Sequence, residues 1–190
     1  MSITQTCHLE ILQRVKKINY AIDATCGNGH DTLFLCQNLE REGKVFALDL
    51  QPQAIANTKL QLQRHDISQD RYSCILSSHD QIQSVIPSHL HLKIEVIMFN
   101  LGYLPGSDKK ITTAWDTTQK AIEYAIKNYL SPNGVMSILF YPGHLEGREE
   151  LTRWNIWKNT LNPHCKIEEI SNPTTSSLSP VLFVLQKTTC

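Results

Sequence analysis

The sequence predicts a doubly wound α/β fold with a seven-stranded, mostly parallel sheet. The first observation behind this prediction is the alternation of short apolar runs with segments of helical periodicity. The second is that most of these runs are apolar at every position, which is typical of strands that helices cover on both faces. The third is that no helical segment separates the last two runs, so we expect them to form an antiparallel hairpin at one edge of the sheet.

The first half of the chain alternates expected helices with expected strands. The first helix rests on the helical spacing of Leu9, Leu12 and Val15, and Pro52 suits the first turn of the third. The expected helices span 4–17, 31–40 and 52–64. The expected strands are YAIDA, KVFALDL and YSCIL, at 20–24, 44–50 and 72–76.

The second half continues the alternation up to the terminal hairpin. Its longest expected helix, over 112–130, carries one stripe of large or apolar side chains: Trp115, Ile122, Ala125, Ile126 and Tyr129. SPNG, at 131–134, is expected to be the turn that ends this helix. A weak helix over 80–86 and a helix over 146–161 complete the set. The expected strands are IEVIMFN, VMSILFY, CKIEEI and PVLFVLQK, at 94–100, 135–141, 165–170 and 180–187.

Composition limits the classes of protein to which the chain can belong. With 190 residues, 41% of them hydrophobic and 19% charged, it is expected to form a single domain at 1–190, with an N-terminal helix at 1–18 and a core at 20–190. Eighteen Lys and Arg balance eighteen Asp and Glu, so a polyanion must be met by a local patch. No signal-peptide or membrane-span pattern is present, which predicts a soluble, cytoplasmic protein without a membrane partner. The six cysteines are scattered, and no metal site is expected.

The segment AIDATCGNGHDTLFLC, at 21–36, joins the first strand to the second helix through a polar turn. In a sheet of this kind, ligands bind beyond the carboxyl ends of the strands, near the point where the strand order reverses. Gly27 and Gly29 allow a tight turn and the close approach of a ligand, and the helix that follows offers free N–H groups. Asp23, at the end of the strand, is placed to reach across the turn. A purely structural use of the two glycines is the alternative interpretation.

The residues after the glycines indicate which ligand the turn suits. The dinucleotide fingerprint has a third small residue where this chain has Thr32, and the Asp31 carboxylate would repel a pyrophosphate. Asp49, at the end of the next strand, is in position to bind a pair of ribose hydroxyls. A nucleoside with a cationic tail fits both features, and S-adenosylmethionine is therefore the expected cofactor.

Five segments carry a resemblance to a known family: DATCGNGHDT, ALDLQPQAI, SSHD, IMFNLGYLPGSDKKITT and YPGHLEGREE. In order and spacing they resemble the MnmM (YtqB) family, whose members are also described as rRNA methylases. The resemblance covers roughly residues 20–150. It implies a Rossmann-like class I methyltransferase that uses S-adenosylmethionine to methylate the 5-aminomethyl group of the tRNA wobble uridine, including its 2-thio form.

The resemblance also implies where the cofactor is held. The methionine end is implied to lie among Asn28, His30, Asp31 and Thr32. The ribose is implied to contact Asp49 and Gln51, and the adenine to lie beside Ser78 and His79. Asp23, Gly27 and Gly29 from the turn, and Asn100 after the fourth strand, complete the expected cofactor contacts.

The run FNLGYLPG follows the fourth strand on the side where the methyl group should point. It resembles the Asn-Pro-Pro-aromatic turn of amino-methylating enzymes, in which an asparagine oxygen and a backbone carbonyl accept hydrogen bonds from the target amine. By this resemblance Asn100 and the Leu101 carbonyl are the acceptors, and Tyr103 stacks on the base. Tyr141 and His144, in YPGH after the fifth strand, are candidates for contacting the base or relaying a proton. Because positioning alone can lower the barrier by several kcal/mol, we expect it to outweigh a dedicated base.

Docking of tRNA through its anticodon stem-loop requires phosphate contacts. Lys109 and Lys110 follow the Asn100 turn, and Arg148 and Arg153 follow YPGH. Their expected place on the rim of the site favours RNA, whereas charges on exposed loops commonly serve only solvation. A homodimer is a further expectation.

Three other functions compete with this interpretation. A methyltransferase for a small amine or catechol-like metabolite would suit the zero net charge. A nucleotide-sensing or RNA-binding module without turnover would not need Asn100 opposite the glycine turn. A dinucleotide-dependent oxidoreductase is disfavoured by Asp31 and by the absent third glycine.

Overall fold

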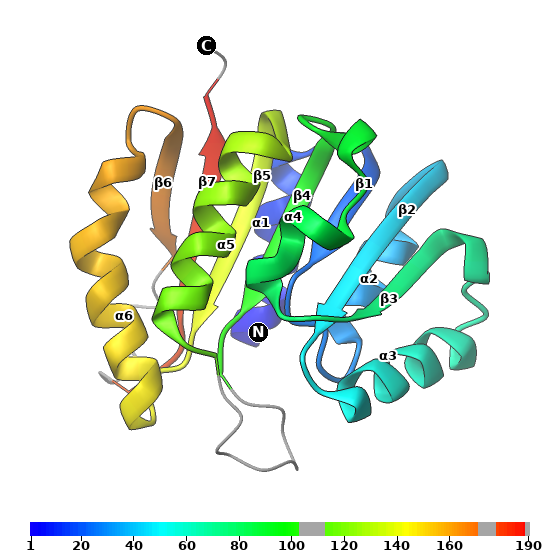
Figure 1. Cartoon of the computed structure of the whole chain (residues 1–190), viewed down its shortest axis with the longest axis horizontal. Coiled ribbons are helices and arrows are strands. Elements are labelled where there is room, and N and C mark those ends of the chain that lie inside the picture. The colour runs from blue at the N-terminus through cyan, green and yellow to red at the C-terminus, as the bar shows by residue number, and fades with distance from the viewer. Residues whose placement is uncertain (103–112, 171–177, 189–190) are drawn as a thin grey trace.

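The computed structural model describes residues 1–102, 113–170 and 178–188. These residues form a seven-stranded sheet in the order β3-β2-β1-β4-β5-β7-β6, with helices on both faces (Figure 1). The strands are β1 (Ile18–Asp23), β2 (Leu39–Asp49), β3 (Tyr72–Leu76), β4 (Ile94–Asn100), β5 (Leu130–Phe140), β6 (Cys165–Ile170) and β7 (Val181–Lys187). The strand order reverses at β1, which pairs with β2 on one side and β4 on the other. The predicted α/β fold is confirmed.

The sheet is parallel from β3 to β5 and antiparallel at its other end. β7 runs antiparallel to β5, and β6 runs antiparallel to β7. The predicted terminal hairpin is therefore confirmed, with β7 inside the sheet and β6 at its edge. The connection over 171–177, which joins these strands, lies outside the described residues, as does 103–112.

Helices cover each face of the sheet with a separate apolar layer. In Figure 1, α5 and α6 lie in front of the sheet, while α1 and α2 lie behind it. The α-helices are α1 (Ile3–Arg14), α2 (His30–Gln37), α3 (Pro52–Arg64), α4 (Ile82–Val85), α5 (Trp115–Asn128) and α6 (Leu145–Trp157). The short 3₁₀ helices are η1 (Gln69–Arg71), η2 (His79–Gln81), η3 (Ser88–Leu90) and η4 (Lys158–Leu161).

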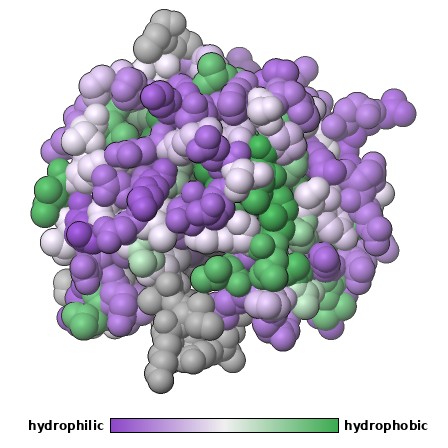
Figure 2. Space-filling view, in the orientation of Figure 1, coloured by the Kyte–Doolittle hydropathy of each residue, from purple (hydrophilic) through white to green (hydrophobic). Residues whose placement is uncertain are grey.

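The central strands are apolar at every position because successive residues enter opposite layers. In β4, Ile97 and Phe99 pack with α4, α5 and α6, whereas Val96 and Met98 pack with α1 and α2. The predicted stripe of α5 is buried from Trp115 to Tyr129. Figure 2 shows this face of the molecule, on which hydrophilic side chains cover most of the outer surface of α5 and α6.

Two strands, β2 and β5, begin five residues earlier than the sequence predicts. While β4 advances from Ile94 to Val96, its partner β5 advances from Leu130 to Val135, so SPNG forms a bulge within β5. The prediction of SPNG as a separate turn was therefore wrong in extent, because Leu130 already pairs with β4. The start of β2 contains the same kind of irregularity after Leu39.

Among the described residues, no helix combines the length and the apolar character that a membrane span requires. The same part of the chain holds no cluster of three or more His, Cys, Asp or Glu side chains that could bind a metal ion.

Candidate active site

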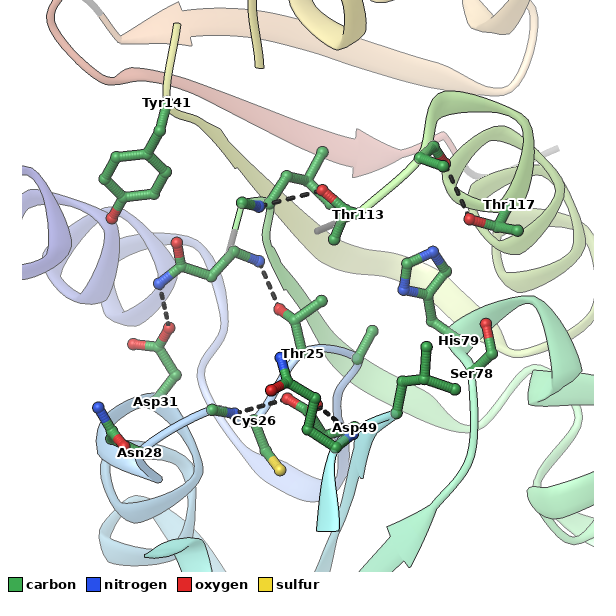
Figure 3. Close-up of a pocket in the computed structure, with 18 of the residues that line it drawn as sticks. Thr25, Cys26, Asn28, Asp31, Asp49, Ser78, His79, Thr113, Thr117 and Tyr141 are labelled. Carbon is green, nitrogen blue, oxygen red and sulfur yellow. Dashed lines mark hydrogen bonds between the residues drawn. The ribbon is translucent and has the colours of Figure 1, made fainter. Parts of the chain in front are cut away.

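A cavity of about 720 Å³ lies beyond the carboxyl ends of the five parallel strands. Cavities of this size are typical of small-molecule and cofactor sites. Each parallel strand contributes the segment that follows it, and the start of α5 adds a further wall (Figure 3). The predicted site residues on the cavity wall are Gly27, Asn28, His30, Asp31, Asp49, Gln51, Ser78, His79, Asn100, Leu101, Tyr141 and His144.

Asp49 joins the glycine turn to the end of β2. Its Oδ2 accepts the backbone N–H of Gly27 at 3.0 Å, and its Oδ1 accepts the backbone N–H of Gln51 at 2.9 Å. A carboxylate has about four acceptor positions, so Asp49 can still accept the hydroxyls of a bound ribose. Asn28, on the same turn, is held by the Asn57 side-chain amide of α3 at 2.8 Å.

Gly29 lies beside the cavity but does not line it. Its φ of 82° is in the left-handed region, and a Cβ at this position would lie 2.8 Å from Thr58 Cα of α3. Glycine is therefore required here for the turn and for its packing against α3, and the approach of a ligand to this position stays a prediction.

Asp23 and Thr32 also lie beneath the turn, away from the cavity wall. The Thr32 hydroxyl donates to Asp23 Oδ2 at 2.6 Å, and the Thr25 backbone N–H donates to Asp23 Oδ1 at 3.2 Å. Complete burial, and next the charge of Asp31, raise the pKa of Asp23 to about 7. These contacts make Asp23 and Thr32 supports of the turn, and their direct contact with a ligand stays a prediction.

Asn100 and Leu101 are held by three hydrogen bonds. Its backbone N–H donates to Thr25 Oγ1 at 2.7 Å, and its side-chain Nδ2 donates to Asp31 Oδ2 at 3.3 Å. The next residue, Leu101, donates its backbone N–H to Leu139 of β5 at 2.8 Å. Figure 3 shows Asp31 and Thr25 on either side of this segment, with the Tyr141 ring reaching in from the end of β5.

Tyr141 and His144 belong to a closely packed turn between β5 and α6. His144 caps α6, because its Nδ1 accepts the backbone N–H of Gly147 at 3.2 Å. A Cβ on Gly147 would lie 2.1 Å from the Tyr141 carbonyl oxygen and 2.4 Å from the His144 ring, so only glycine fits there. Burial raises the pKa of Tyr141 above its usual value, which keeps its hydroxyl protonated.

A buried polar network underlies the wall formed by α5 and α6. Glu150, 2% exposed, accepts the hydroxyl of Thr113 at 2.8 Å and that of Thr118 at 3.2 Å. Thr113 Oγ1 in turn accepts the backbone N–H of Gly102 at 3.0 Å, and Thr118 Oγ1 lies 3.5 Å from His79 Nε2. Burial lowers the pKa of His79 to about 4, so its ring is neutral near pH 7. Burial also raises the pKa of Glu150.

The expected RNA-binding residues are only partly described. Tyr103, Lys109 and Lys110 lie outside the described residues. Arg148 is exposed near the start of α6, whereas Arg153 pairs with Asp116 at 3.0 Å and lies 4.0 Å from Glu149.

The charges on the described cavity wall fit a cationic ligand better than a phosphorylated one. Asp31 and Asp49 line the cavity, and none of its described lining residues is Lys or Arg. A sulfonium and an amino group suit this wall, whereas a pyrophosphate would meet two carboxylates without a cation beside them. The residues present therefore fit S-adenosylmethionine.

Sequence reasoning missed four residues that support the site: His8, Thr25, Thr113 and Glu150. The sequence carried a signal for Glu150, because its spacing from Gly147 and Trp154 places it on the buried face of α6. A buried acid needs hydrogen-bonding partners. Thr25 lies two residues after the end of β1. His8 carries no comparable pattern.

The model of a family described as "Putative rRNA methylase" matches residues 45–186. The chain belongs to this family. The predicted resemblance is thereby confirmed, and the chain is an S-adenosylmethionine-dependent methyltransferase.

Similar proteins span nearly the whole chain. A protein of Arabidopsis thaliana described as "tRNA (mnm(5)s(2)U34)-methyltransferase, chloroplastic" is 33% identical and matches 97% of this chain and 69% of its own length. A crystal structure described as a "putative rRNA-methylase" from Clostridium thermocellum has a TM-score of 0.89 and 30% identity, with 98% of each chain covered. A methyltransferase from Streptococcus mutans, solved in complex with SAH, has a TM-score of 0.82 and 30% identity, with 97% of each chain covered.

Proposed function

We propose that the chain transfers a methyl group from S-adenosylmethionine to the 5-aminomethyl nitrogen of the tRNA wobble uridine, including the 2-thio form. The name of the Arabidopsis relative supports this substrate. Within the chain, the observation that carries the proposal is the orientation of Asn100. Its Nδ2 donates to Asp31, so its Oδ1 is the end of the amide that can accept from a substrate amine.

The cofactor is held by the turns after the first three strands. When bound, S-adenosylmethionine supplies an electrophilic methyl group on a positively charged sulfur. Asp49 accepts the ribose hydroxyls with Gln51 beside it, and His79 and Ser78 border the adenine. Asp31 attracts the positive charges at the methionine end, where Asn28 and His30 complete the wall.

Alignment of the amine is the main catalytic contribution of the acceptor side. The Asn100 Oδ1 and the Leu101 carbonyl accept hydrogen bonds from the amine and direct its lone pair toward the methyl carbon. The amine nitrogen would form the N–C bond as the S–C bond breaks, the electron pair of the S–C bond would stay on the sulfur as a neutral thioether, and the proton lost by the nitrogen would pass to water. Because burial raises the pKa of Tyr141, its hydroxyl serves as a hydrogen-bonding group rather than as the base.

The RNA contacts begin at the start of α6. Arg148 is exposed there, whereas Arg153 already pairs with Asp116, so Arg148 is the better candidate for a phosphate contact. Lys109, Lys110 and the stacking residue Tyr103 stay predictions, as do the homodimer, the cytoplasmic location and the single-domain organisation at 1–190.

The proposal is tested by incubating the protein with methyl-labelled S-adenosylmethionine and tRNA that carries 5-aminomethyluridine at the wobble position. Nucleoside mass analysis is expected to show the label on the 5-aminomethyl group. Label on a small amine but not on tRNA would replace the proposal with the metabolite methyltransferase. Labelling of tRNA at another nucleotide would also contradict it.

The role of Asn100 is tested by Asn100→Ala, with Asn155→Ala on the exposed face of α6 as a matched control. Turnover should fall about a hundredfold or more in Asn100→Ala, because the amine loses the group that aligns it, while cofactor affinity stays within about threefold. An equal loss of affinity and turnover would remove Asn100 from the acceptor site.

A further inference from the structure

The N-terminal helix contacts Asp31, on the wall of the cavity, through His8. The His8 Nε2 lies 2.7 Å from Asp31 Oδ1, and the two side chains are only 20% and 9% exposed. The His8 ring also stacks on Phe34 of α2, with 3.8 Å between the ring centroids and 2° between the planes. The imidazole is thus held by stacking and by a short hydrogen bond, which together fix its orientation.

Asp31 links His8 to Asn100, because each of its carboxylate oxygens has a different partner. Oδ1 faces His8, and Oδ2 accepts the Asn100 Nδ2 at 3.3 Å. An ionised carboxylate only accepts hydrogen bonds, so the amide must present its N–H group to Asp31 and its oxygen to the cavity. The orientation of Asp31 therefore decides which end of the Asn100 amide meets a substrate.

A second residue of α1 approaches the same end of the cavity. Thr4, one helical turn before His8, interacts with the Tyr141 side chain, which also interacts with Asn100. Between them, Cys7 is buried, as is Ile11 one turn further on, so this face of the helix is anchored in the core. Figure 1 shows the N-terminus at the end of the sheet where β4 and β5 finish.

We propose that His8 is a positioning residue for methyl transfer, which acts through Asp31 to hold the Asn100 amide with its oxygen toward the substrate. The inference rests on the proposed role of Asn100 as the acceptor for the amine. Without the His8 N–H, Asp31 is held at one oxygen only and can rotate. The Asn100 amide is then no longer held in one orientation. In a fraction of the molecules Nδ2 faces the substrate, and this group cannot accept a hydrogen bond from an amine.

Two substitutions separate this role from simple packing. His8→Gln keeps an N–H group near the position of Nε2, whereas His8→Met fills a similar volume without a donor. His65→Met, at an exposed histidine of the α3 C-terminus, is the matched control. In His8→Met, kcat should fall about tenfold while the cofactor Kd changes by less than about threefold, and His8→Gln should recover most of kcat.

A second measurement does not depend on turnover. In a ¹⁵N-labelled protein, the side-chain amide protons of Asn100 should exchange slowly with water in the wild type and in His8→Gln, and faster in His8→Met. If His8→Met keeps the slow exchange of the wild type, or keeps its kcat, the inference is wrong. Equal losses in the two variants would mean that the ring acts by stacking on Phe34.

The two measurements also separate this inference from the proposed function. Absence of tRNA methylation by the wild type would overturn the proposed function, while the amide exchange would still report on His8. Methylation of tRNA together with unchanged exchange in His8→Met would overturn the inference alone.

Discussion

Asp49 accepts the backbone N–H of Gly27 across a distance of 3.0 Å, which ties the end of β2 to the turn after β1. A second bond, from the Gln51 backbone N–H to the other carboxylate oxygen, fixes the carboxylate plane. The group proposed to bind the ribose is therefore also the group that shapes the loop around the methionine end. Loss of its charge should affect both parts of the cofactor site.

Asp49→Asn should weaken cofactor binding by about 10- to 100-fold. The substitution removes a charged acceptor, and hydrogen bonds to charged groups contribute about 1.5–3 kcal/mol each. Calorimetric titration with S-adenosylmethionine or its demethylated product measures the effect. Asp66→Asn is a suitable control, because Asp66 is exposed and its φ of 55° is one that asparagine tolerates. Equal affinity in the two variants would contradict the assignment of Asp49.

Gly147→Ala should destabilise the protein by about 1–3 kcal/mol and reduce turnover, because the new methyl group overlaps the Tyr141 carbonyl and the His144 ring. Gly143→Ala, in the same turn, is the control, since its Cβ would meet only an ordinary contact at 3.7 Å. Urea unfolding and initial rates of both variants test the expectation. Comparable stability of the two proteins would show that the turn can relax.

Glu150→Ala should lower the free energy of unfolding by about 2–4 kcal/mol, because it leaves the Thr113 and Thr118 hydroxyls without their buried acceptor. Turnover should fall as well, since Thr113 holds Gly102 beside Asn100. Denaturant unfolding of Glu150→Ala and of Glu149→Ala, its exposed neighbour, provides the comparison. A similar loss of unfolding free energy in both variants would show that the Glu150 network does not stabilise the fold.

His79 should make the protein less stable as the pH falls below neutral. Its pKa is about 4 in the folded protein and 6.5 as the ordinary value, so between these pH values the unfolded chain binds more protons. The stability that the neutral His79 ring contributes is fully present above about pH 6.5 and is lost as the pH falls toward 4. Between pH 7 and pH 5 the wild type should lose about 1–2 kcal/mol that His79→Gln retains. Identical pH profiles of unfolding for both proteins would show that the ring is solvated.

Much of the fold was predictable because the pattern of apolar residues along the chain reflects which side chains each element buries. YSCIL, IEVIMFN and CKIEEI became β3, β4 and β6 at the predicted bounds. SPNG was not predicted correctly, because its turn chemistry is satisfied by a bulge inside β5 once Leu130 pairs with β4. Such pairing depends on a partner strand far away in the sequence.

The site was predictable where residues follow strands directly. Asp49, His79 and Asn100 lie at the carboxyl ends of parallel strands, which must meet at one edge of the sheet. His8 and Glu150 could not be placed in this way, because only helix packing brings them to the strand ends. The close packing of Gly29 against Thr58 was equally hidden from the sequence, because it depends on how α3 packs against the turn.

The most direct test of the account is a crystal structure of the protein with the demethylated cofactor bound. The ribose hydroxyls should lie within hydrogen-bonding distance of Asp49, and the sulfur should face the side chain of Asn100. A cofactor bound elsewhere, or bound in the cavity with its sulfur facing away from Asn100, would contradict the account.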